Sequence, residues 1–268
     1  MKTLRVIFSL LLCAGLLCGC MPTPQPEPPP VPSEVPSEAP TTPPESTEVP
    51  PETTTEPTKP EHSELYIPDL SVEDVILYFN EVCLDAEIVN AGDATLLQKW
   101  DAPILYQLNG TYTDADLVTL TTFCTWLNTI EGFPGIYEAQ ESDAPNLLIY
   151  FCSGPDMVEI LGGDFFYMDG GVTFWYDEEN RIYDAMICYR TELDQQLRNS
   201  VILEEIYNGL GPVQDTQLRP DSIIYAEFSQ PQALTQIDEL ILRLLYHPDM
   251  KCGMNAEECA EVIRQLYY

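Results

Sequence analysis

The sequence predicts an α+β domain in which helices pack against a small mixed sheet. Three observations predict this class. Helical and strand patterns alternate through the first half of the domain, two apolar strands flank an acidic turn near its middle, and helical patterns dominate its C-terminal third. The domain is expected to span residues 65–268, about 200 residues, which is enough for one core.

The first half of the domain opens with a helix, a strand and a second helix. Ser71 has acidic residues after it and apolar residues at helical spacing, which is typical of a capped helix over 71–82. Residues 99–110, KWDAPILYQLNG, are typical of a strand that ends at an Asn-Gly turn. The second helix is expected over 113–127, where apolar residues again recur at helical spacing.

The second half contains three strand patterns and then three helical ones. A short buried strand is expected at 146–152, and two strands within 171–190 are joined by the acidic turn 177–180. A helix should follow over 194–211 and stop at Gly209 or Gly211. The last two helices are expected at 238–246 and 256–266.

The N-terminus has the order of a secretory signal. Lys2 and Arg5 precede an apolar run over 6–17, which is too short to span a membrane as a mature helix. Residues 17–20, LCGC, resemble the bacterial lipobox, in which a cysteine thiol is acylated before cleavage on its N-terminal side. We therefore expect residues 1–20 to be a signal peptide, and Cys20 to carry the lipid that anchors the mature protein to the extracytoplasmic face of the cell membrane.

A proline-rich linker is expected to separate this anchor from the domain. Fifteen of the 24 prolines fall between Pro22 and Pro60, among Thr, Ser and Glu and with few apolar residues, so no core can form there. Residues 21–64 are therefore predicted to be a disordered, largely extended tether.

Charge and histidine content exclude several functions. The net charge of −33 becomes −35 when Lys2 and Arg5 are removed, so nucleic acid is a poor partner. His62 falls in the linker, which leaves His247 as the domain's single histidine and excludes sites that need two or three. A nucleophile paired with histidine would have to use His247, which lies beside Pro248 near a helix end and is better explained as a packing residue.

The domain has an even number of cysteines, which permits disulfides outside the cell. Cys252 and Cys259 flank the turn-like segment KCGMNAEEC and form the one specific pair that we predict. The others lie in apolar stretches, where buried free thiols are equally reasonable. They are Cys83, Cys124, Cys152 and Cys188.

One segment has the spacing of a known catalytic motif without its ligands. From Ser200 the sequence reads SVILEEIYNGLGPVQDTQ, which resembles the zinc-peptidase pattern H-E-x-x-H-x-x-G-x-x-H-D. Glu205 matches the general-base glutamate and Gly211 the glycine that ends the helix, and Asp215 matches the final aspartate. The three histidine positions are occupied by Glu204, Asn208 and Gln214.

The sequence after this motif extends the resemblance. Residues 222–225, SIIY, resemble a Met-turn with Ile224 in place of methionine, and LTQIDELILRLLY resembles the helix that closes metzincin domains. The glutamate pair, the LG before QD, and the DSI, LT-x-x-D and YHPDMKCGM segments are similar to the family called domain of unknown function 2927. The resemblance covers residues 200–266 and implies a zincin-like fold with a small mixed sheet, an active-site-type helix and closing helices, but without its metal ligands.

Three classes of function remain open. The resemblance and the missing histidines favour a protein without catalytic activity, metal or cofactor, whose former substrate cleft binds a peptide, a protein or a cell-wall component. The alternative is a hydrolase that uses Glu205 with Glu204 or Asp215, with or without a hard cation such as calcium. Glu204 and Glu205 point about 100° apart on a helix, which counts against that pair. A solute-binding lipoprotein usually has two lobes, for which this domain is short.

Overall fold

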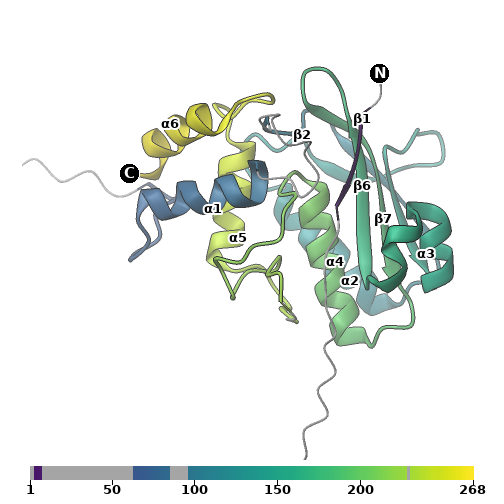
Figure 1. The fold of residues 1–268 in the computed structure, drawn as a ribbon. Coiled ribbons are helices and arrows are strands. Elements are labelled where there is room, and N and C mark those ends of the chain that lie inside the picture. The colour runs from purple at the N-terminus through teal and green to yellow at the C-terminus, as the bar shows by residue number, and fades with distance from the viewer. Residues whose placement is uncertain (1–2, 8–62, 85–95, 228–229) are drawn as a thin grey trace, which may run out of the picture. The chain divides into compact units, whose positions relative to one another are not determined.

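The computed structural model describes residues 3–7, 63–84, 96–227 and 230–268 (Figure 1). Cys20 and most of the predicted linker lie outside these ranges, so the anchor and the tether remain predictions. None of the described helices has the length and apolar character needed to cross a membrane.

The described part contains one seven-stranded mixed sheet with the strand order β1-β6-β7-β5-β3-β4, and β2 pairs with β7. Strands β3, β4, β5 and β7 run parallel to their neighbours within this group, whereas β6 is antiparallel to both β7 and β1. The strands are β1 (Thr3–Ile7), β2 (Lys99–Trp100), β3 (Ile104–Gly110), β4 (Ile136–Glu138), β5 (Leu147–Cys152), β6 (Gly170–Tyr176) and β7 (Arg181–Arg190). The structure therefore confirms that the domain combines helices with a mixed sheet, although the sheet is larger than the small one predicted, and the zincin-like assignment stays a prediction.

Helices cover both faces of this sheet. On one face α4 packs against β6, β7 and α2, and apolar residues of the strands meet it. On the other face α3 and the short 3₁₀ helix η1 cover β5, β6 and β7 with a smaller apolar cluster. These elements are α2 (Asp114–Leu127), α3 (Gly154–Leu161), η1 (Gly163–Tyr167) and α4 (Gln195–Gly209).

The remaining helices form a second group, drawn in blue and yellow in Figure 1. They are α1 (Val72–Leu84), α5 (Gln236–Tyr246) and α6 (Ala256–Tyr267). The two ends of the domain meet here, because the Tyr267 hydroxyl donates to the Leu70 carbonyl at 2.9 Å and accepts from the Ile67 amide at 3.2 Å. The Ser63 hydroxyl also donates to the Tyr267 carbonyl.

Most predicted elements are confirmed. The acidic turn joins β6 to β7, and Asn180 adopts a positive φ of 62° there while its amide donates to the Asp177 carbonyl. The single strand predicted over 99–110 is wrong, since it is two strands with different partners. Pro103 lacks an amide hydrogen and separates them, and β2 pairs with β7 while β3 pairs with β4 and β5.

Candidate functional site

Helix α4 carries the motif and is capped at both ends. Asp194 begins it by accepting a hydrogen bond from the Leu197 amide at 3.1 Å. At its other end the Trp100 indole donates to the Gly209 carbonyl at 2.9 Å, and the Tyr246 hydroxyl donates to the Leu210 carbonyl at 2.7 Å. The predicted stop at Gly209 is confirmed, and side chains distant in the sequence satisfy the last carbonyls.

The motif positions of α4 lie in its C-terminal half, where every residue from Ser200 to Gly209 is buried. Glu204, Glu205 and Asn208 are 7%, 1% and 0% exposed. Glu205 packs against β6 at Gly170, where an added Cβ would lie 2.9 Å from the Glu205 carboxyl oxygen Oε1. A larger residue at position 170 would collide with the Glu205 side chain, so glycine allows β6 and the motif helix to pack closely here.

Gly211 turns the chain as the motif predicts. Its φ is +133°, and an added Cβ would lie 2.6 Å from the Gln98 carbonyl oxygen. The following segment docks on the end of α1, where the amides of Val213 and Gln214 donate to the Val82 carbonyl at 2.7 and 3.2 Å. Asp215 is buried beside this contact.

The Met-turn-like segment 222–225 is buried and tied to α5. The Ser222 hydroxyl accepts a hydrogen bond from the Tyr78 hydroxyl at 2.9 Å and donates one to Asp238 Oδ1 at 2.6 Å. Asp238 also caps α5 by accepting from the Thr235 amide and hydroxyl. Burial raises the pKa of Asp238 despite these donors. Ile224, at the methionine position, is fully buried.

Lys99 is a buried cation that the sequence pattern did not single out. Its ammonium donates to the Leu245 and Met250 carbonyls at 2.8 and 2.6 Å, so it closes the end of α5. Burial lowers its pKa to about 8. No local signal marks it, because its partners lie far along the chain.

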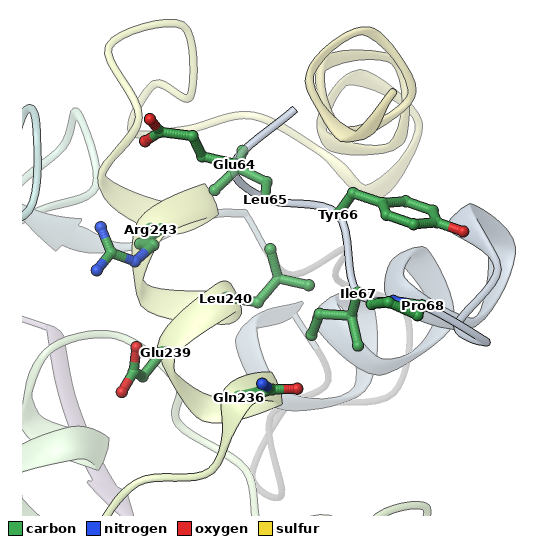
Figure 2. Close-up of a pocket in the computed structure, with 9 residues that line it drawn as sticks. All are labelled: Glu64, Leu65, Tyr66, Ile67, Pro68, Gln236, Glu239, Leu240 and Arg243. Carbon is green, nitrogen blue, oxygen red and sulfur yellow. The ribbon is translucent and has the colours of Figure 1, made fainter. Parts of the chain in front are cut away.

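A cavity of about 350 Å³ lies where the domain begins (Figure 2). Segment 64–68 forms one wall and α5 forms the other through Gln236, Glu239, Leu240 and Arg243. Figure 2 shows Leu240 and Ile67 facing the space between these walls. The cavity is lined by residues outside the motif.

The described cysteines are free thiols in this structure, Cys252 and Cys259 among them, and the predicted pair stays a prediction. The Cys252 thiol lies 3.7 Å from the Lys99 carbonyl, and Cys259 is buried in α6.

The donor chemistry at the motif is unsuited to zinc. One carboxylate and two carboxamides stand where a catalytic site needs three strong ligands, and amide oxygens donate little charge to the ion. Across the described ranges, no group of three or more His, Cys, Asp or Glu is placed to hold a metal ion.

Comparison with known families gives one match. The sequence profile of the family described as "Protein of unknown function (DUF2927)" matches residues 73–265, well over half of the chain. The chain therefore belongs to this family. No curated protein and no solved structure matches it significantly.

Proposed function

From this family membership and the geometry of α4, we propose that the protein is a lipid-anchored extracytoplasmic binding module. Its zincin-like domain has lost the zinc ligands and binds an extended peptide along the edge of β6. One observation carries the proposal: residues Thr3–Ile7 pair with β6 as an antiparallel strand, from Thr3 opposite Tyr176 to Ile7 opposite Val172.

The strand on β6 comes from the predicted signal peptide. Cleavage before Cys20 would remove it and leave β6 as an open edge in the mature protein. An open edge presents unpaired amide and carbonyl groups, which an extended peptide can satisfy by adding a strand. The seated segment is apolar except at Thr3 and Arg5, so the edge accepts mixed apolar and basic sequence.

Charge supports the same kind of ligand. The mature chain has a net charge of −35, obtained by removing Lys2 and Arg5 from a chain of −33. Such a surface attracts cationic partners and repels anionic ones. The proposed ligand is therefore an extended peptide with at least one basic residue.

The burial of the motif favours binding over hydrolysis. A general base has to reach water or substrate within hydrogen-bond distance. Glu205 is 1% exposed and packs against Gly170. The hydrolase alternative would need this carboxylate to emerge from the contact between α4 and β6.

The test is a titration of the mature chain, which begins at Cys20, with a fluorescent peptide of residues 2–10. Saturable binding is expected, and a scrambled peptide should bind at least about tenfold more weakly. N-methylation of successive peptide residues should weaken binding only at every second position, because alternate amides face the partner strand in an antiparallel ladder. Equal effects at all positions, or no binding, would contradict the proposal.

A further inference from the structure

Both lysines of the domain line one cavity of about 300 Å³ at the end of α5. Lys99 reaches it from β2, and Lys251 reaches it from the loop that follows α5. Two acidic residues, Asp101 and Glu179, also line it, and so does His247. None of these residues belongs to the α4 motif or to β6, so the cavity is separate from the proposed peptide site.

The loop after α5 is a fixed wall of this cavity. The Gly253 amide donates to the Leu97 carbonyl at 2.8 Å, and the Leu97 amide donates to the Met254 carbonyl at 2.8 Å. Gly132 lies close to the end of α5, where an added Cβ would be 2.2 Å from the Tyr246 carbonyl oxygen. The cavity is therefore built into the fold, and a ligand can bind without first ordering the loop.

The lysines of the domain differ from its arginines in how their charges are neutralised. Within the described ranges, five of the six arginines pair with a carboxylate at 3.8 Å or less, and Arg243 lies over the Trp126 ring. Neither lysine forms such a pair there, although the chain has 44 Asp and Glu residues for 11 Lys and Arg. In so acidic a chain, two ammonium groups that share a cavity and lack a carboxylate indicate a site for an anionic group.

Each ammonium group has donors left for a ligand. Lys99 is 7% exposed, and its ammonium donates to the Leu245 and Met250 carbonyls at 2.8 and 2.6 Å. The Lys251 ammonium donates to the Pro248 carbonyl in the same loop. Because an ammonium carries three N–H groups, one on Lys99 and two on Lys251 have no acceptor among the described residues. A carboxylate is well suited to accept from both lysines.

The acidic residues of the cavity restrict the ligand to one that carries both signs of charge. Glu179 pairs with Arg181 at 3.0 Å, whereas the Asp101 carboxylate has no hydrogen bond or ion pair with another described residue. These carboxylates repel a phosphate dianion and attract an ammonium group. A volume of about 300 Å³ is at the lower end for small-molecule sites, so it suits a monomer. We propose that the cavity binds a free α-amino acid, with its carboxylate on Lys99 and Lys251 and its ammonium group near Asp101.

The site is tested by calorimetric titration of the full chain with each of the standard amino acids. Saturable binding of at least one of them is expected, with one site per chain. Two analogues of that amino acid should each bind at least about tenfold more weakly, because each leaves charged groups of the site without a partner. One analogue lacks the amino group, and in the other an amide replaces the carboxylate. No binding of any amino acid, or analogues that bind as tightly as the amino acid, would overturn the proposal.

Two variants at exposed positions separate the roles of the lysine and the aspartate. Lys251→Met should lower the affinity for the amino acid by at least about tenfold, because it removes donors to the carboxylate. Asp101→Asn should weaken binding of the amino acid and leave binding of the analogue without an amino group unchanged.

The matched control is Lys59→Met, which removes the same charge from the predicted linker and should bind the amino acid like wild type. Thermal melts check that each variant is folded. Peptide binding at β6 should be the same in all of them, so the two proposals can fail separately. Wild-type affinity for the amino acid in folded Lys251→Met or Asp101→Asn would overturn the proposal.

Discussion

The Ser222 hydroxyl donates a 2.6 Å hydrogen bond to Asp238 Oδ1 and joins the segment after the motif helix to the first turn of α5. The same hydroxyl accepts from Tyr78, so a single buried oxygen connects α1, the Met-turn-like segment and α5. This relation explains why the DSI and LT-x-x-D segments occur together in the sequence. The DSI segment supplies the Ser222 hydroxyl, and the LT-x-x-D segment supplies the Asp238 carboxylate that accepts its hydrogen bond.

Ser222→Ala should lower the free energy of unfolding by about 1–3 kcal/mol, because it removes the acceptor of the buried Tyr78 hydroxyl and the hydroxyl that donates to Asp238 Oδ1. Urea denaturation at neutral pH measures the change. Ser142→Ala, at an exposed loop position, is the control and should change little. Equal stabilities of the two variants would show that water replaces the hydroxyl.

Lys99 should make stability rise with pH above neutrality. Burial lowers its pKa from 10.5 to about 8, so between these values the folded chain binds fewer protons than the unfolded chain. Stability therefore increases as pH rises through this window. Unfolding free energies from pH 7.5 to about 9.5 should climb more steeply in wild type than in Lys99→Met. Lys59→Met, in the predicted linker, should retain the wild-type slope.

Restoring histidines should restore a zinc site if α4 keeps zincin geometry. Positions 204 and 208 lie one turn apart in the buried C-terminal half of α4, and Gly211 turns the chain before position 214. Wild type should show no stoichiometric zinc, and Glu204→His, Asn208→His and Gln214→His together should bind it tightly.

Calorimetric zinc titration of wild type and of the triple histidine variant measures whether each binds zinc. Asn208→His alone is the control, and circular dichroism confirms that each variant is folded. Activity need not return with the metal, since the residues that orient each imidazole are also required. Tight zinc binding by wild type would contradict the proposal that the motif has lost its zinc ligands. A folded triple variant that binds no zinc would contradict the zincin-like assignment.

Lipidation should depend on Cys20. Cys20→Ser removes the thiol that we propose as the lipid acceptor, so the protein should remain unprocessed or be released from the membrane. Membrane fractionation with metabolic labelling by a fatty acid measures both effects, and Cys18→Ser should be processed like wild type. Normal processing and labelling of Cys20→Ser would show that another residue is the anchor.

The tether should be the first part of the chain that a protease cuts. Residues 22–64 have too few apolar side chains to offset the entropy of an ordered chain, whereas the domain buries an extensive core. Limited proteolysis followed by mass spectrometry should give a resistant fragment that begins near residue 63. A resistant fragment that begins near residue 25 would place the domain boundary much earlier.

Local patterns were sufficient for the elements whose boundaries are set locally. The cap of α1 at Ser71 and the acidic turn between β6 and β7 are each encoded within a few residues, and the structure confirms them. The glycine that turns the chain after the motif helix was equally predictable, because Gly211 stands at a fixed distance from Glu205 in the motif, and its positive φ is confirmed.

Features that depend on distant partners could not be predicted in this way. Lys99 and Trp100 look like the start of one strand, but they pair with β7 and close helix ends more than 100 residues away. The helix α3 begins with Gly-Pro-Asp, which is equally typical of a turn. The placement of Cys188 opposite Tyr150 depends on strand register, and register is a property of the assembled sheet.

The contact of Tyr267 with Ser63, Ile67 and Leu70 gives the domain an almost circular connectivity. A linker of a few residues would join its ends, and new termini placed in the turn between β6 and β7 would leave every helix intact. A circular permutant of this design should retain the native arrangement. It would also move the tether from the helical side of the domain to the tip of the hairpin, and so reorient the β6 edge relative to the membrane without changing a single side chain.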